Sequence, residues 1–354
     1  MGARLSLLGG FELQCSERAA LVVLPKKARA LFIVGYRATG VMTIEAGGRV
    51  LNDGDSFIGY TLLADSMATV TGPGSTWANT GSLVVGNSGA GALVVAAGAT
   101  VSNTDGVIGS DNGSSGIATV TGQGSTWTNR GTLVVGSMGM GTLNVHDGGV
   151  VSAASGMTIG LQGLVTGNGT IVAEVRNAGT VAPGNSPGTL MIDGSYLQSA
   201  LGTLSIELEN LAHVDLLIIN GNATLSGTLA LSCFAACSFA VGDEFVILDA
   251  GGTLVGGFAG DPTLSGFATG KFEIAYDRPN GDVWLRVTES VTAVPEPQTC
   301  ALMLAGLLAA GAAVRRSASN IRAVAKYSGY RAMARPAVPT RRYMRYRPGC
   351  ISAG

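Results

Sequence analysis

The sequence contains few charged residues, few aromatic residues and almost no histidine. Charged residues make up 13% of the 354 positions and aromatic residues 6%, and only two histidines, His146 and His213, are present. Neither histidine lies near a cysteine or a pair of acids at the spacing of metal ligands. We therefore expect no metal site and no bound cofactor, and we interpret both histidines as turn or surface residues.

Basic residues are scarce in the longest part of the chain. Residues 38–314 contain six lysines and arginines against 21 acids, a net charge of −15, whereas residues 315–354 contain ten basic residues and no acid. Proteins that bind nucleic acid cluster lysine and arginine on one face. The acidic body is therefore not expected to bind nucleic acid, and residues 317–354 are predicted to form a basic, disordered tail.

The body also lacks the 3.6-residue apolar periodicity of helices. Short segments with alternating apolar residues, such as Leu83-Val84-Val85 and Leu93-Val94-Val95, are bounded by Gly, Asn, Ser and Asp. This pattern is typical of short strands and tight turns. The chain contains 54 glycines and is 46% hydrophobic, so it has enough apolar residues for a long core. We predict an all-β protein.

Internal repetition indicates the architecture. The segment ATVTGPGSTWANTGSLVVG at 68–86 returns as ATVTGQGSTWTNRGTLVVG at 118–136, with 15 of 19 positions identical at an offset of 50 residues. About three strand and turn sets in each unit imply coils of about 17 residues, stacked about 4.8 Å apart. The repeats over 38–163 therefore predict a right-handed parallel β-helix or β-solenoid. A β-propeller is the alternative, but two and a half repeats cannot close a ring.

Two tryptophans, Trp77 and Trp127, occupy equivalent positions in the repeats. They could pack as a ladder inside the solenoid or stack on its outer surface, where paired aromatic rings can hold sugars. We favour the internal ladder. Inward positions such as Val85 and Val95 are expected to stack on their counterparts in neighbouring coils.

From residue 164 the pattern is looser. Residues 164–290 contain the motif N-x-G-x-V-x-P-G-x-S-P-G-x-L-x-I-x-G-x-Y-x-Q, which begins at Asn177 and ends at Gln198. This stretch resembles the distal part of autotransporter passengers. The resemblance implies that the β-helix continues through this region, and we expect the strands FVILDA, KFEIAYD and DVWLRV to cap it.

Residues 294–316 have three parts in a fixed order. Pro295-Glu296-Pro297 is followed by an uncharged run from Cys300 to Val314 and then by Arg315 and Arg316. This order resembles the PEP-CTERM sorting signal of Gram-negative exported proteins. A helix of 15 residues at about 1.5 Å each is too short for a comfortable membrane span. The arginines would hold its end on the cytoplasmic side, which suits a transient inner-membrane anchor.

The resemblance to sorting-signal proteins implies a partner and a location. An exosortase would cut near Pro295-Glu296-Pro297, and the protein would be secreted or held at the cell surface in association with exopolysaccharide, as in a biofilm matrix. The fold also hosts polysaccharide lyases and glycosidases, which is the competing function. We expect no enzyme, because Glu45 becomes Ala96 and then His146 in successive repeats, and the adjacent acids Asp243-Glu244 lie in a predicted turn.

Two features are left open by the sequence. Residues 1–37 include Glu12 and Glu17 and no unbroken apolar run of a signal peptide, so we interpret them as a fused segment or a misassigned start. About 30 of these residues resemble the opening strands of bacterial transcriptional activators of the antibiotic-regulatory type, which is too little to bind DNA. Cys233 and Cys237 could form a disulfide in an oxidising compartment or remain reduced.

Overall fold

The computed structural model describes residues 31–184, 187–234 and 237–293 with their side chains, and residues 3–7, 11–15 and 21–23 by their backbone. The chain divides into two compact units, Met1–Pro295 and Glu296–Gly354, and the described residues all belong to the first. Every regular element in them is a β-strand, as predicted, and they include no helix with the length and hydropathy needed to span a membrane. The predicted sorting helix and basic tail lie outside the described residues.

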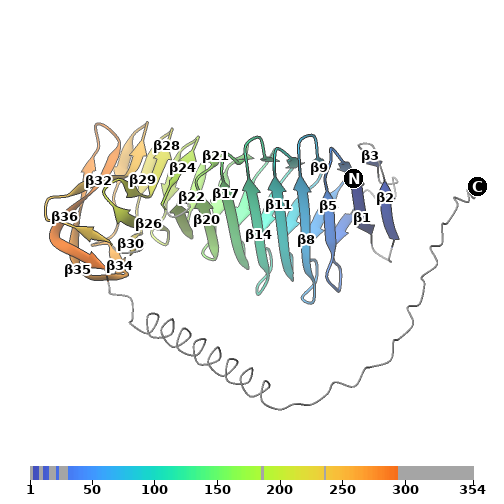
Figure 1. Cartoon of the computed structure of the whole chain (residues 1–354), viewed down its shortest axis with the longest axis horizontal. Helices are drawn as coiled ribbons and strands as arrows, with labels where there is room; N and C mark the ends of the chain where they lie inside the picture. The colour runs from blue at the N-terminus through green and yellow to red at the C-terminus, as the bar shows by residue number, and fades with distance from the viewer. Residues whose placement is uncertain are drawn as a thin grey trace, which may run out of the picture. The chain divides into compact units, whose positions relative to one another are not determined.

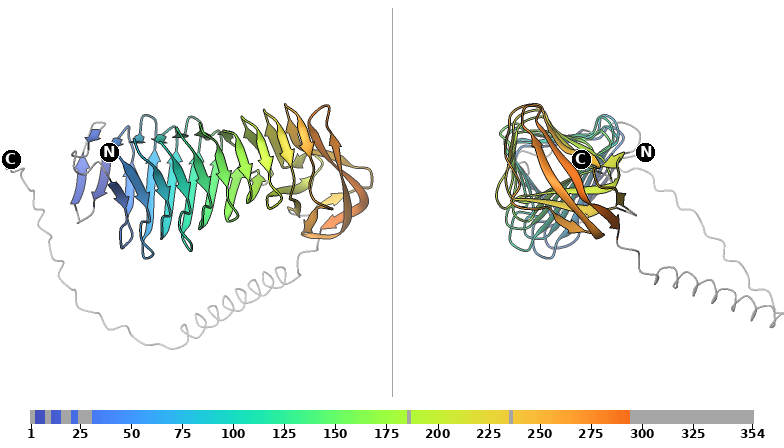
Figure 2. Two further views of the ribbon diagram at one scale, coloured as in Figure 1. Left: turned by 180° about the vertical axis from the view of Figure 1, so that it is seen from behind. Right: turned by 90° about the vertical axis from the view of Figure 1, so that its left-hand side faces the viewer.

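The strands form three long sheets that run along a parallel β-solenoid (Figures 1 and 2). The three sheets are called A, B and C, and their strands are given below. Each turn contributes one strand to sheet C, then one to sheet A and then one to sheet B. Neighbouring strands from β4 to β30 pair in parallel, except for the short antiparallel β27 beside β26. The predicted parallel β-solenoid is therefore confirmed.

Sheet C contains ten described strands. They are β4 (Leu31–Val34), β7 (Asp55–Ile58), β10 (Leu83–Val85), β13 (Gly106–Ile108), β16 (Leu133–Val135), β19 (Met157–Ile159), β22 (Val175–Asn177), β25 (Tyr196–Gln198), β29 (Ala223–Leu225) and β33 (Leu254–Gly256).

Sheet A contains 13 described strands. They are β1 (Ala3–Leu7), β2 (Phe11–Cys15), β5 (Val41–Ile44), β8 (Asp65–Thr71), β11 (Ala90–Ala96), β14 (Ser115–Thr121), β17 (Met140–His146), β20 (Gly163–Gly167), β23 (Thr180–Pro183), β26 (Thr203–Asn210), β27 (His213–Val214), β30 (Thr228–Cys233) and β34 (Thr263–Ser265).

Sheet B also contains 13 described strands. They are β3 (Leu21–Val23), β6 (Arg49–Asn52), β9 (Thr76–Asn79), β12 (Thr100–Asn103), β15 (Thr126–Asn129), β18 (Val150–Ala153), β21 (Thr170–Val172), β24 (Thr189–Ile192), β28 (Leu216–Ile219), β31 (Ser238–Phe239), β32 (Glu244–Ala250), β35 (Phe267–Asp277) and β36 (Asp282–Ala293).

The coil is longer than the sequence suggested. Met67, Ala92, Ile117 and Thr142 are successive register partners in sheet A, so each turn advances the chain by 25 residues there. The predicted coil of about 17 residues was wrong, because one coil uses three strands and the 50-residue repeat spans two coils.

The two coils of a repeat differ at the same inward position of sheet B. Val101 lies between Trp77 and Trp127, and all three are fully buried.

The core is a column of apolar side chains inside the three sheets. Strands such as β11 alternate between buried and partly exposed residues, and Val85 and Val95 are completely buried, as predicted. The first six strands of sheet C, β4 to β19, end in an apolar residue followed by glycine. Gly109, one of these glycines, has φ of +70°, and a Cβ added to it would lie 2.3 Å from the Met140 carbonyl oxygen of the next coil. This close approach explains the recurring apolar-Gly pair.

The far end of the solenoid is closed by an antiparallel layer. β36 pairs antiparallel with β31, β32 and β35, which ends the parallel stacking of sheet B. Figure 2 shows these strands folded across the last coils. Phe239, Phe245 and Phe272 pack against one another beneath them, with ring centroids 5.4 to 6.4 Å apart. The segments predicted to form a cap therefore form β32, β35 and β36.

Candidate functional site

The predicted processing residues are Pro295, Glu296, Pro297, Arg315 and Arg316. All five lie outside the described residues, so no geometry can be given for them. Other residues singled out from the sequence lie in the solenoid or its cap.

The tryptophans lie inside the solenoid, in one column with Val101 between them, rather than in a solvent-facing stack. Trp127 is fully buried, and its Nε1 donates to Asn103 Oδ1 at 2.7 Å in the preceding coil. Asn103 Nδ2 in turn donates to Asn129 Oδ1 at 2.6 Å. Trp77 is also fully buried, and its Nε1 has no hydrogen-bond partner. The favoured structural interpretation of both rings is confirmed, and neither ring is available to hold a sugar on the surface.

The two adjacent acids considered for catalysis, Asp243 and Glu244, are already engaged. Asp243 Oδ2 accepts a hydrogen bond from Ala240 N at 2.8 Å and stabilises the turn before β32. Glu244, the first residue of β32, accepts from Arg286 Nε at 2.5 Å. Glu45 follows β5 and has Thr71 beside it in the next coil, rather than a second acid.

Cys233 and Cys237 form a disulfide between β30 and β31, which resolves the alternative left open above. Cys237 is buried at the end of the core.

Sequence reasoning missed a buried acid. Asp215 is fully buried, and its two carboxylate oxygens accept hydrogen bonds of 2.8 Å from Gly188 N and Glu207 N. Burial raises its pKa to about 7, and the nearby Glu207 carboxylate adds to this effect, while the two backbone hydrogen bonds oppose it. Asp215 links β26 to the turn before β24. No sequence signal separated it from the exposed acids.

A second missed group is a row of acids on the cap. Asp249, Asp282 and Asp277 lie directly opposite one another on the neighbouring strands β32, β36 and β35. Partial burial and the charges of Asp249 and Asp277 raise the pKa of Asp282. The described residues nevertheless contain no group of three or more His, Cys, Asp or Glu side chains arranged to hold a metal ion.

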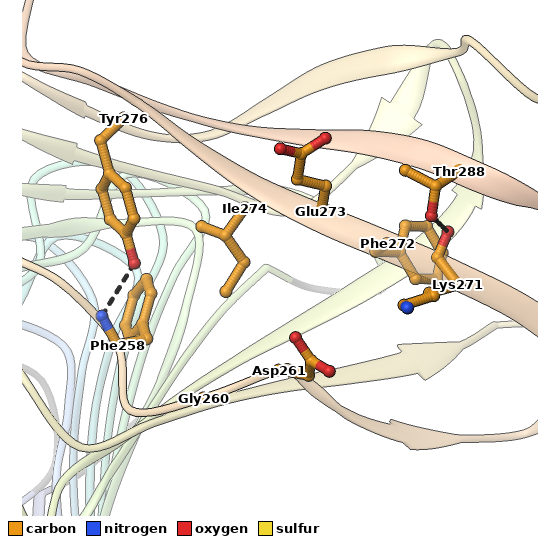
Figure 3. Close-up of a pocket in the computed structure, with 9 residues that line it drawn as sticks. All are labelled: Phe258, Gly260, Asp261, Lys271, Phe272, Glu273, Ile274, Tyr276 and Thr288. Carbon is orange, nitrogen blue, oxygen red and sulfur yellow. Dashed lines mark hydrogen bonds between the residues drawn. The ribbon is translucent and has the colours of Figure 1, made fainter.

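The cap contains a hollow of about 450 Å³, here called the cap hollow (Figure 3). It lies between β35 and the loop that connects β33 to β34. Its lining is Phe258, Gly260, Asp261, Lys271, Phe272, Glu273, Ile274, Tyr276 and Thr288. The size falls within the range of small-molecule sites, about 300–1,000 Å³. The antiparallel return of β35 creates this hollow, so the sequence alone did not reveal it.

One end of the cap hollow is aromatic. Tyr276 and Phe258 lie side by side there, and the Tyr276 hydroxyl accepts a hydrogen bond of 2.8 Å from Phe258 N (Figure 3). Arg278 lies 5.5 Å from the centroid of the Tyr276 ring and donates at 2.7 Å to Gly256 O. Burial raises the pKa of Tyr276, so the hydroxyl keeps its proton at neutral pH.

The opposite end of the cap hollow is charged. The carboxylate of Asp261 and the ammonium of Lys271 both point into the gap between β35 and the loop (Figure 3). Both residues are exposed, and within the described structure neither side chain forms a hydrogen bond or an ion pair. The Thr288 hydroxyl donates to Lys271 O at 3.2 Å and connects β36 to β35 at this end.

Comparison with known proteins identifies one further feature. A protein-family model described as the PEP-CTERM protein-sorting motif matches residues 293–317, a range that contains Pro295-Glu296-Pro297 and both arginines. No curated protein matches the chain. The match confirms the sorting motif inferred from the sequence. Proteins with this motif are exported, processed by an exosortase and sorted to the cell surface.

Proposed function

We propose that this protein is an exported, non-enzymatic structural protein of the cell surface or extracellular matrix. Its β-helical body resembles an autotransporter passenger and associates with exopolysaccharide in a biofilm, and an exosortase releases or attaches it after a transient stay in the inner membrane. The single observation that carries the proposal is the PEP-CTERM motif at residues 293–317.

The fold supports a structural role for the body. Its core runs without interruption from Phe32 in the first coils to Val291 in the cap. Such a solenoid gains stability from contacts between neighbouring coils, so it can be extended along one axis without a central site. We further propose that the coil is right-handed, because connections between parallel strands of one sheet are right-handed in about 98% of cases.

The arrangement of Asp243 and Glu244 supports a role without catalysis. Glycosidases need two carboxylates about 5 to 9.5 Å apart, free to act on the sugar. Asp243 and Glu244, the adjacent acids considered for this role, form a turn hydrogen bond and an ion pair instead. We expect the purified protein to release no reducing ends or unsaturated products from exopolysaccharide. Sustained release would support the competing lyase or glycosidase function.

Substitutions in the motif test the sorting part of the proposal. Glu296→Ala should leave an uncut precursor in the membrane, because the exosortase is expected to recognise the Pro-Glu-Pro tripeptide. Leu304→Ile is the matched control and should be processed, since the apolar run keeps its hydrophobicity. Removal of Arg315 and Arg316 should let the short segment slip through the membrane. The measurement is precursor size in a host with an exosortase, with a signal peptide supplied.

Unchanged cleavage of the Glu296→Ala variant would contradict the proposal. The uncharged run would then act as an ordinary hydrophobic tail, and the proposed release at the cell surface would lose its support.

A further inference from the structure

We propose that the cap hollow is a binding site for a neutral saccharide, about one or two sugar units of a longer chain. The proposal rests on the proposed function only for the extracellular location that gives the site access to polysaccharide. The geometry that carries it comes from the cap alone. The lining combines an aromatic wall at one end with opposite, unpaired charges at the other (Figure 3).

The polar groups match the hydroxyls of a sugar, which both donate and accept hydrogen bonds. Asp261 offers a carboxylate acceptor, and Lys271 offers an ammonium donor on the facing strand β35. They point into the same hollow without forming an ion pair with each other. A ligand that bridges the carboxylate and the ammonium would satisfy both groups.

The aromatic end supplies the second requirement of a sugar site, an apolar surface for the C–H face of the ring. The partly exposed ring of Tyr276 provides this surface, with the buried Phe258 beside it, and the hydrogen bond from Phe258 N to the Tyr276 hydroxyl holds the ring in place. The hydroxyl proton itself has no acceptor in the described structure, so it remains available to a ligand. Gly260 lines the hollow with a φ of +74°, and the position of its missing Cβ faces open space.

The charge balance indicates a neutral ligand. Asp261 and Glu273 carry negative charge at the hollow and Lys271 carries positive charge, so the lining has a net charge of −1. The surrounding body is acidic, with 21 acids against six basic residues over 38–314. A polyanion such as a uronic acid polymer would be repelled by this field, whereas an uncharged sugar would not.

The test uses the purified full chain and three neutral glucose trisaccharides: cellotriose, maltotriose and laminaritriose. Saturation-transfer NMR should show transfer from the protein to ring protons of at least one of them, and trigalacturonate should show none. Asp261→Asn and Lys271→Met should each weaken the binding by about tenfold, which corresponds to about 1.4 kcal/mol. Asp65→Asn is the matched control: Asp65 is exposed on β8, far along the chain from the cap, and should bind as the wild type does.

Neither substitution removes a side-chain hydrogen bond or ion pair of the described structure, so the circular dichroism spectrum and melting temperature should stay unchanged. The absence of transfer to all three neutral sugars would overturn the proposal, as would equal affinity in the wild type, Asp261→Asn and Lys271→Met. Cleavage near Pro295-Glu296-Pro297 is measured separately on the same variants. Normal cleavage without sugar binding would contradict the proposed sugar site and leave the sorting proposal intact. Sugar binding without cleavage would contradict the sorting proposal and leave the sugar site intact.

Discussion

Trp127 donates a hydrogen bond of 2.7 Å to Asn103 in the preceding coil, and both side chains are fully buried. One repeat earlier, Trp77 and Asn52 occupy the corresponding places, but Trp77 Nε1 and Asn52 Oδ1 have no hydrogen-bond partners. Two repeats that are nearly identical in sequence therefore differ in the satisfaction of a buried polar pair. An unsatisfied buried group costs about 1–3 kcal/mol, so this difference should be measurable.

Phenylalanine substitutions test this difference. Trp127→Phe should lower the free energy of unfolding by about 1–3 kcal/mol more than Trp77→Phe, because only the first removes a hydrogen bond and leaves Asn103 Oδ1 without its donor. Both variants lose a similar amount of aromatic packing, so each is the control for the other. Urea unfolding followed by circular dichroism provides the comparison. Equal losses would show that the Trp127 hydrogen bond makes no net contribution.

Two glycines allow the stability cost of a steric clash to be measured separately from the cost of backbone strain. Gly109 and Gly113 both have positive φ, +70° and +80°. A Cβ at Gly109 would lie 2.3 Å from the Met140 carbonyl oxygen, whereas a Cβ at Gly113 would meet nothing within 4 Å. Gly113→Ala should cost about 1 kcal/mol from strain alone. Gly109→Ala should cost several times more, as measured by melting temperature, and equal costs would contradict the close coil contact.

Adjacent valines on β11 test the inward and outward assignment. Val95 is fully buried, whereas Val94 is partly exposed on the outer face between Thr69 and Thr119. Val95→Asp places a charge in the core without a partner and should cost several kcal/mol or prevent folding. Val94→Asp should stay within about 1 kcal/mol of the wild type. Soluble yield and urea midpoint give the result, and similar losses at both positions would contradict the assignment.

Asp215 predicts a specific pH dependence of stability. Its pKa is about 7 in the folded protein, raised from the value of 3.8 for an aspartate in water. Between pH 4 and 7 the folded protein retains a proton that the unfolded chain has released, so the free energy of unfolding falls as pH rises through this window. The difference between the pKa values of Asp215 in the folded and unfolded states corresponds to a loss of at most roughly 4 kcal/mol in the free energy of unfolding. Stability lost in this way remains lost above pH 7.

Asp215→Asn should remove most of this dependence, because the amide does not titrate. The variant should also carry a constant cost, since the asparagine NH₂ group cannot accept a hydrogen bond from Gly188 N or Glu207 N. Melting temperatures from pH 5 to 8 should therefore vary less in the variant than in the wild type. Parallel curves for the two proteins would assign the pH dependence to other groups.

The sequence by itself determined the strands, the parallel stacking and the inward faces. Valines, leucines and isoleucines that alternate between glycine-rich turns predict short stacked strands, because each inward residue packs against its equivalent in the next coil. The sequence also determined the sorting motif, because its tripeptide, uncharged run and arginines are local and contiguous.

The coil length could not be read from the sequence, because alternate coils place different residues at the same inward position. Trp77 and Trp127 repeat after 50 residues, but Val101 lies in register between them, and only strand pairing reveals the 25-residue turn.

The sequence indicated which segments form the cap, but only the tertiary structure decided their antiparallel pairing and the hollow that it creates. Asp261 and Lys271 face one gap because β35 returns antiparallel to β36 and lies above the loop that precedes β34. Asp215 is buried because β26 and the turn before β24 close over it. Neither the shared gap nor the burial of Asp215 follows from a local sequence pattern, because both depend on contacts between segments that are distant in the chain. The alternation of apolar residues shows only which face of a strand a residue occupies.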